Sequence, residues 1–118
     1  MPTPRERCDH ISGAVDAIFR DVNGHDERAF LAVDGLQAAC YYRLIVIGEA
    51  SADLARRSGP LIVANFPALT TDLSKAHRLR TRLAHQYHRT DPAIIWVTIQ
   101  KTLRPFQTDI NRLRAILP

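Results

Sequence analysis

Apolar residues recur along most of the chain with the spacing of an α-helix. From Ile11 to Val22 they return at every third or fourth position, and they do so again from Ile95 to Leu117. This period gathers apolar side chains on one face of a helix and leaves the other faces to water. The pattern therefore predicts amphipathic helices near both ends of the chain.

The middle of the chain carries the same pattern, interrupted by turn-forming residues. Residues 23–26 predict a turn, with Asp26 as the N-cap of a second helix that is expected to run over 27–57. Ser-Gly-Pro at 58–60 predicts the end of that helix, with Gly59 as its C-cap and a proline beyond it.

Two further helices are expected in the second half of the chain. The third begins near Thr70–Thr71, and Thr-Asp-Pro at 90–92 separates it from the fourth, which Pro105 is expected to kink. Four to five amphipathic helices with short connections predict an all-α fold, an antiparallel helical bundle. A length of 118 residues predicts a single domain over 1–118.

Composition supports a globular protein and excludes little else. Lys and Arg number 16 against 12 Asp and Glu, an excess that permits an anionic partner without requiring one. Cys8 and Cys40 are too few for a disulfide scaffold and are expected to be free thiols. The first residues lack the apolar segment of a signal peptide, and no apolar run is long enough to span a bilayer. A cytoplasmic protein without membrane contact is therefore expected.

The segment from Leu73 to Thr90 is basic and contains no Asp or Glu. Helix surfaces usually alternate both signs of charge, because neighbouring opposite charges stabilise the helix. A surface with uncompensated positive charge is better explained by an anionic partner such as RNA phosphate. The candidates for RNA binding are Lys75, Arg78, Arg82, His88 and Arg89.

Arginine and histidine together can cleave RNA without a metal ion. A histidine can take the proton of the 2′-OH or protonate the leaving 5′-oxygen, and an arginine can stabilise charge on the phosphate. His85, His88 and Asp91 are a weaker candidate for a metal site, because a convincing third ligand is missing. No metal and no cofactor are expected. Spacing alone does not select the pair, since Arg78 and Arg82 also fall near these histidines.

One arrangement in this segment resembles a family signature. Arg80, His85 and Tyr87 follow the order R-x4-H-x-Y of HepT-like ribonuclease toxins in the HEPN superfamily. The segment 30–54, with its Gly-Glu-Ala element at 48–50, is similar to the family's long second helix. The segment 87–106 is similar to its link into the last helix.

The resemblance implies a function for each part of this signature. Arg80 and His85 would be the catalytic residues of a metal-independent ribonuclease, which the resemblance suggests acts on tRNA. The protein would be the toxin of a type VII-like HEPN/MNT toxin–antitoxin system and a symmetric homodimer, with the two motifs facing each other across a cleft. Its partner, a minimal nucleotidyltransferase (MNT) antitoxin, would neutralise it by adding AMP to Tyr87.

Two residues near the motif bear on this interpretation. The family usually has Asn or Asp directly after the arginine, where this chain has Thr81. Thr81 supports the alternative, a non-catalytic helical partner that holds substrate for a nucleotidyltransferase. Glu49 is expected to form an ion pair with an arginine of the third helix. The alternative for Glu49 is that it orients Arg80 or His85 within the cleft.

The spacing of Arg80 and His85 favours a composite site. Five residues on an ideal helix rotate by about 140°, so the two side chains do not share one narrow face. The helix must end or bend near His85, or a second protomer must complete the site. Gly48 is expected to permit a close approach of helices, and Trp96 is expected to pack in the core or at an interface.

Overall fold

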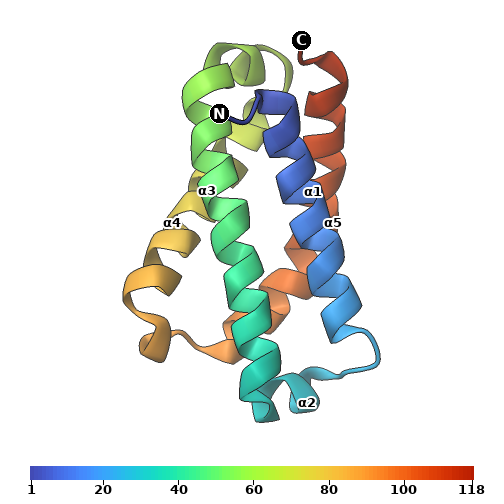
Figure 1. Ribbon diagram of the computed structural model, residues 1–118, viewed down its shortest axis with the longest axis vertical. Coiled ribbons are helices and arrows are strands. Elements are labelled where there is room, and N and C mark those ends of the chain that lie inside the picture. Colours follow the sequence, from blue (N-terminus) through green and yellow to red (C-terminus); the bar gives the residue numbers. More distant parts are fainter.

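The computed structural model describes residues 1–118 and contains only helices (Figure 1). The long helices are α1 (Pro4–Val22), α3 (Asp34–Asn65), α4 (Pro67–His85) and α5 (Pro92–Ile116). Two short elements connect them, the helix α2 (Glu27–Ala32) and a 3₁₀ helix, η1 (Tyr87–Arg89).

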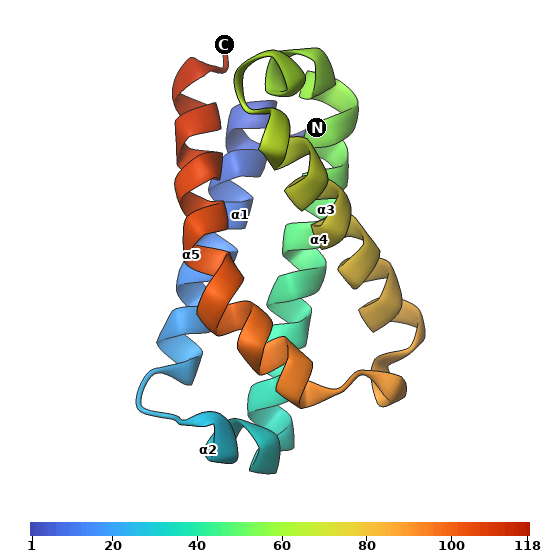
Figure 2. The same ribbon diagram turned by 180° about the vertical axis from the view of Figure 1, so that it is seen from behind.

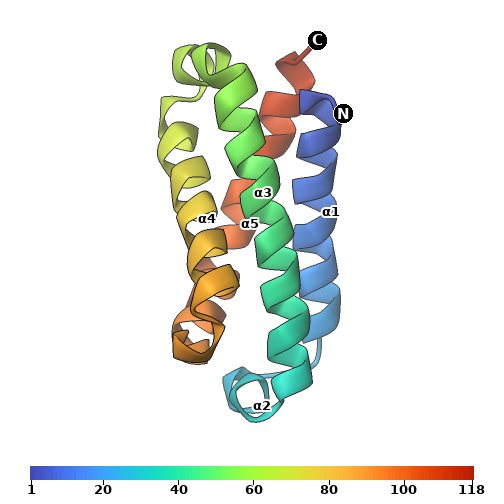
Figure 3. The same cartoon turned by 60° about the vertical axis from the view of Figure 1, so that its left-hand side comes forward.

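The long helices run alternately up and down, so the chain ends lie at the same end of the molecule (Figure 1). α3 packs against α1 on one side and α4 on the other, while α5 packs on α1 (Figure 3). α4 contacts α5 little, and the two helices lie apart over most of their length (Figure 2). The predicted all-α antiparallel bundle is confirmed. None of its helices combines the length and apolar character needed to cross a lipid bilayer.

Side-chain caps explain where three of the helices begin. Thr3 and Glu6 form a reciprocal capping box at α1, with Thr3 Oγ1 accepting from the Glu6 N–H at 3.1 Å. Asp26 caps α2 by accepting from the Ala29 N–H at 2.8 Å, as the sequence predicted. Asp91 does the same at α5, where its carboxylate accepts from the Ala93 N–H at 2.9 Å.

The prediction of one helix over 27–57 is wrong at its start. The chain leaves the helical conformation at Val33, which is exposed rather than part of the apolar face. α2 turns across the end of the bundle because Phe30 is fully buried and its ring lies 5.3 Å from that of Trp96. The Gln37 amide then donates to the carbonyl of Phe30 at 2.9 Å, which satisfies a group at the end of α2.

The predicted helix end at Gly59 is also wrong. Ser58 departs from helical geometry with φ −126° and ψ 16°, but helix resumes beyond it and α3 ends only at Asn65. Pro60 explains the kink, because it lacks an N–H and its ring crowds the carbonyl of the preceding turn. α4 begins at Pro67, earlier than the predicted Thr70–Thr71, since proline suits the first helical turn.

The core agrees with the apolar pattern of the sequence. Buried side chains from α1, α3, α4 and α5 form one cluster that includes both cysteines, which are free thiols as predicted. α5 continues through Pro105 and changes direction along its length (Figure 2).

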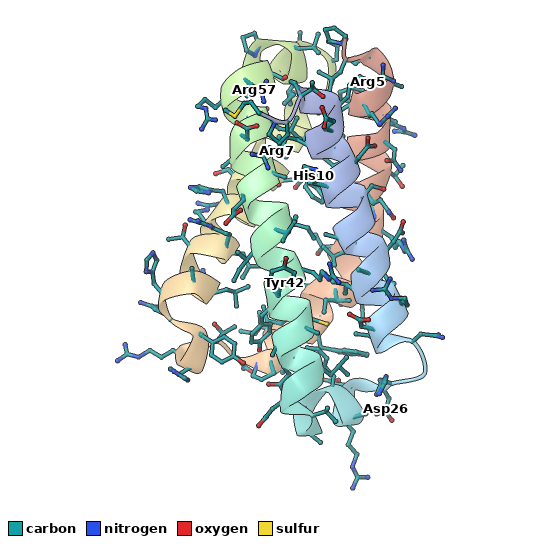
Figure 4. The ribbon with its side chains drawn as sticks, in the orientation of Figure 1. Arg5, Arg7, His10, Asp26, Tyr42 and Arg57 are labelled. Carbon is teal, nitrogen blue, oxygen red and sulfur yellow. The ribbon has the colours of Figure 1, made fainter.

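One buried carboxylate fastens the N-terminus to α3. Asp53 is 3% exposed and accepts from Arg7 Nε at 2.9 Å and Arg57 Nη1 at 3.1 Å, and it also pairs with Arg56. Figure 4 shows Arg7 and Arg57 at this end of the molecule. Burial alone would raise the pKa of Asp53, but the hydrogen bonds from Arg7 and Arg57 hold it below its usual range. The carboxylate is therefore a charged structural link at neutral pH.

Candidate active site at the end of α4

Arg80 lies where α4 approaches α3 most closely. A Cβ atom on Gly48 of α3 would overlap the Cβ of Arg80 and come within 2.7 Å of the Ala76 carbonyl oxygen. Only glycine therefore permits this approach without displacing α4. The expectation that Gly48 allows close helix packing is confirmed, and the residue that it brings against α3 is the predicted catalytic arginine.

The guanidinium of Arg80 is half-buried, and only some of its N–H groups have a hydrogen-bond partner in the protein. Its Nη2 lies 3.4 Å from Glu49 Oε1, which confirms the predicted ion pair between Glu49 and an arginine of this helix. Its Nε is buried and has no hydrogen-bond partner. Glu49 is exposed. The pair holds the end of the guanidinium at the surface of the α3–α4 contact, where an incoming anion can reach it.

The helix that carries Arg80 ends at His85. Gln86 leaves the helical conformation with φ −132° and ψ 38°, and its N–H donates to the Arg82 carbonyl at 2.7 Å. His85 is exposed on the last turn, and no hydrogen bond joins it to Arg80. The helix therefore ends near His85, as the spacing argument expected, and both Arg80 and His85 belong to α4.

Tyr87 follows in η1 and is 42% exposed. Its ring lies edge-on between Tyr41 of α3 and the adjacent His88, with ring centroids 5.4 Å away in both cases. Tyr41 is buried, and its hydroxyl has no hydrogen-bond partner. Burial, followed by the nearby Tyr87 and Asp91, raises the pKa of Tyr41. The arrangement holds the Tyr87 ring in place and leaves part of it open to solvent.

The contact between Tyr41 and Tyr87 was not predicted from the sequence. The signal that could have found it is the place of Tyr41 on the buried face of α3, one residue from Cys40. Thr81, the residue that departs from the family pattern, uses its hydroxyl within its own helix. Its Oγ1 donates to the His77 carbonyl at 3.2 Å.

The remaining basic candidates fall into two groups. His88 and Arg89 are exposed in η1, beside Tyr87. The others line a cavity of about 450 Å³ among α3, α4 and α5, whose lining does not include Arg80, His85 or Tyr87. The cationic lining residues are Lys75, Arg78 and Arg82.

No group of three His, Cys, Asp or Glu side chains is placed to hold a metal ion, so His85, His88 and Asp91 do not form a ligand cluster. The cysteines are not reactive groups either. Burial, and then the charge of Asp9, raises the pKa of Cys8 to about 11. Burial, and then Asp21, raises the pKa of Cys40 to about 11. Both are neutral thiols at neutral pH.

Comparison with known proteins identifies the family. A family model described as Ribonuclease HepT-like matches residues 11–113, which includes all of α2, α3, α4, η1 and most of α1 and α5. No match was found among curated proteins or among solved structures. The match agrees with the all-helical fold and spans the segment that carries Arg80, His85 and Tyr87. The chain therefore belongs to the HepT-like ribonuclease family.

Proposed function

We propose that this protein is the toxin of a HEPN/MNT toxin–antitoxin pair and cleaves RNA, with tRNA as its substrate, without a metal ion. Family membership supports ribonuclease activity in general terms. The more specific proposal rests on the residues that lie at the end of α4. A half-buried arginine at the contact with α3 is followed by an exposed histidine where the helix stops. An exposed tyrosine comes directly after.

The proposed reaction uses the RNA's own nucleophile. His85 accepts the proton of a 2′-OH, the 2′-oxygen bonds to the adjacent phosphorus, and the bond from phosphorus to the 5′-oxygen breaks. A proton delivered to the 5′-oxygen, by His85 of the same or the second protomer, completes the transfer. The products are a 2′,3′-cyclic phosphate and a 5′-hydroxyl. Arg80 binds the phosphate oxygens as charge develops on them, in exchange for its contact with Glu49.

The same geometry suits control by a minimal nucleotidyltransferase. Tyr87 is partly exposed and adjoins His88 and Arg89, whose side chains are also exposed. AMP added to its hydroxyl would introduce negative charge and bulk where the RNA backbone must pass. The modified protein would bind RNA weakly and be silent as a toxin.

The alternative is a non-catalytic helical partner that holds substrate for a nucleotidyltransferase. Thr81 favours it, because its hydroxyl is bonded to the His77 carbonyl and does not contact the catalytic candidates. In that case the basic side chains of α4 bind phosphate and nothing is cleaved.

The decisive experiment is cleavage of purified tRNA in buffer containing EDTA. His85→Ala should lower the cleavage rate by about 10²-fold or more, the range for loss of a general acid–base group. Arg80→Gln should lower it by about 10²–10³-fold, as for loss of a charge-stabilising donor. His10→Ala is the matched control, because His10 is an exposed histidine on α1 (Figure 4).

Circular dichroism spectra should show that all three variants keep the helical fold. Cleavage by His85→Ala at the wild-type rate would refute the assignment of that residue. Tight tRNA binding by the wild-type protein without any cleavage would establish the non-catalytic alternative.

A further inference from the structure

The cavity among α3, α4 and α5 has walls of different chemistry. Its floor is apolar and includes Leu44 and Ile47 of α3, both buried. Lys75, Arg78 and Arg82 line the side formed by α4. α5 contributes Thr98 and Thr102 to the opposite wall, together with buried Leu103 and Phe106. α4 and α5 make few contacts with each other.

The cations of this wall have no counterions in the fold. Lys75, Arg78 and Arg82 form no ion pair, whereas arginines on α1, α3 and α5 pair with acids. The one acid that lines the cavity, Asp72, pairs with none of them. Three unpaired cations beside a single acid give the cavity a net positive wall, which favours an anionic ligand.

The cavity is distinct from the candidate active site. Arg80 and Arg82 are separated by about 200° around the axis of α4, so they lie on nearly opposite faces of the helix. Arg80 faces Glu49 of α3, and Arg82 faces the cavity. A ligand in the cavity would therefore leave Arg80 free. His85 lies one turn beyond Arg82 on the same side of α4 and is not part of the cavity lining.

We propose that this cavity binds a nucleotide unit of single-stranded RNA, with the base on the apolar floor and the backbone phosphates on Lys75, Arg78 and Arg82. A volume of about 450 Å³ falls within the range of sites for small organic ligands. The three cations span about 10 Å along α4, which is more than one phosphate group needs and suits consecutive phosphates. A base presents the flat apolar face that the floor can accept.

The wall formed by α5 offers polar contacts for such a ligand. Thr98 Oγ1 donates to the Ile94 carbonyl at 2.9 Å, so its lone pairs remain free to accept a hydrogen bond. Thr102 is exposed and makes no side-chain hydrogen bond within the protein. These hydroxyls can meet a ribose 2′-OH or the edge of a base, which would give the site a preference for RNA.

This inference rests on the proposed function, which supplies RNA as the ligand. It adds a second region of contact between the protein and that RNA. RNA held by the cavity on one face of α4 would be anchored while another nucleotide reaches Arg80 and His85. The anchored nucleotide, rather than the one at the cleaved bond, would then contribute to substrate choice.

The test measures binding, so that it does not depend on cleavage. The protein carries His85→Ala, and the probes are a fluorescent single-stranded RNA of about ten nucleotides, an abasic backbone of equal length, and free AMP. Thr102→Trp fills the cavity from an exposed position, and Thr108→Trp is its control on the same helix, outside the cavity. Arg78→Gln removes one cation, and Arg28→Gln on α2 is its control.

Thr102→Trp should weaken binding of the RNA about tenfold or more and leave binding of the abasic backbone unchanged, because only the base is displaced. Arg78→Gln should weaken binding of the RNA and of the abasic backbone alike. It should also lower the slope of the logarithm of the binding constant against the logarithm of salt concentration by about one. If Thr102→Trp abolished binding of AMP but left binding of the RNA unchanged, the cavity would be a site for free nucleotides, and the RNA proposal would be overturned.

Two further outcomes separate this inference from the proposed function. Equal RNA affinity of Thr102→Trp and Thr108→Trp would refute the RNA site, and a simultaneous change in sedimentation would assign the cavity to a protein interface. Absence of cleavage by the protein with His85 intact, with binding of the RNA still weakened by Thr102→Trp, would refute the proposed function and leave the RNA site standing.

Discussion

Tyr87 occupies the first position of η1, and the buried Tyr41 behind it supports its ring at a centroid distance of 5.4 Å. The two rings meet edge to face, so this contact does not require the phenol oxygen of Tyr87. A side chain that is 42% exposed and held in place is a suitable acceptor for a modifying enzyme. The chemistry proposed for this residue is therefore separable from its packing.

Tyr87→Phe should remove the AMP acceptor at a small cost in stability, because the ring contacts with Tyr41 and His88 remain. Coexpression with the cognate nucleotidyltransferase should add AMP to the wild-type protein and leave the mass of the variant unchanged. Intact-mass spectrometry measures both. A mass increase that persists in Tyr87→Phe would place the modification elsewhere, and an unshifted wild-type mass would contradict the proposal of modification.

At the scale of elements, the position of α4 depends on one residue of α3. Gly48 allows the backbone of α4 at Ala76 and the Cβ of Arg80 to lie against α3. α4 makes few contacts with α5, so α3 is its main support. A change at this contact would therefore move the whole helix, and with it the arginine proposed to bind the scissile phosphate.

Gly48→Ala should destabilise the protein by about 1–3 kcal/mol, the usual cost of adding a methyl group to a closely packed contact. It should also reduce cleavage, because Arg80 moves with α4. Gly13→Ala is the matched control on α1, where an added Cβ would meet no atom within 4 Å. That change should stabilise the helix by about 0.5–1 kcal/mol.

Chemical denaturation of both variants measures the difference in unfolding free energy. If Gly48→Ala left both the unfolding free energy and the cleavage rate unchanged, the close contact between α3 and α4 would not be needed for stability or for activity.

At the scale of the whole molecule, Tyr42 and Glu49 mark one exposed face of α3. Tyr42 is 60% exposed and lies about two helical turns from Glu49, so both residues occupy similar positions around the helix. Figure 4 shows Tyr42 part-way along α3. A two-fold contact through this face would cover the aromatic ring and place two Arg80–Glu49 pairs close to each other.

We therefore expect a homodimer whose formation Tyr42→Glu disrupts, because a charge would be buried in the contact. Light scattering should give twice the mass of the 13.3 kDa chain for the wild-type protein and a single-chain mass for the variant. Val63→Glu is the control, since Val63 is similarly exposed, at 57%, beyond the kink of α3. A monomeric wild-type protein at micromolar concentration would exclude a site shared between protomers.

The amino-acid sequence by itself determined the helical class, the apolar faces and one of the three side-chain caps, that of Asp26. These follow from local periodicity and from side chains that bond to nearby backbone, such as Asp26 and its N-cap bond at α2. It also indicated the pairing of Glu49 with an arginine of the basic helix and the need for a small residue at Gly48.

The sequence did not determine where long helices break. Val33 interrupts helical geometry inside a segment of continuous pattern, because burial of Phe30 outweighs helix propensity there. At 58–60 the sequence predicted a helix end, but the helix resumes beyond Ser58 and continues to Asn65. Helix ends depend on such long-range packing and on backbone sterics, which a pattern of apolar residues does not record.

Only the tertiary structure decided how the basic residues of α4 are divided. Along the sequence they form one positive segment, but α3 covers the face with Arg80 while the space beside α5 leaves the face with Arg78 and Arg82 open. The physical reason is that residues two apart on a helix point in different directions, and only the neighbouring helices determine what each one meets.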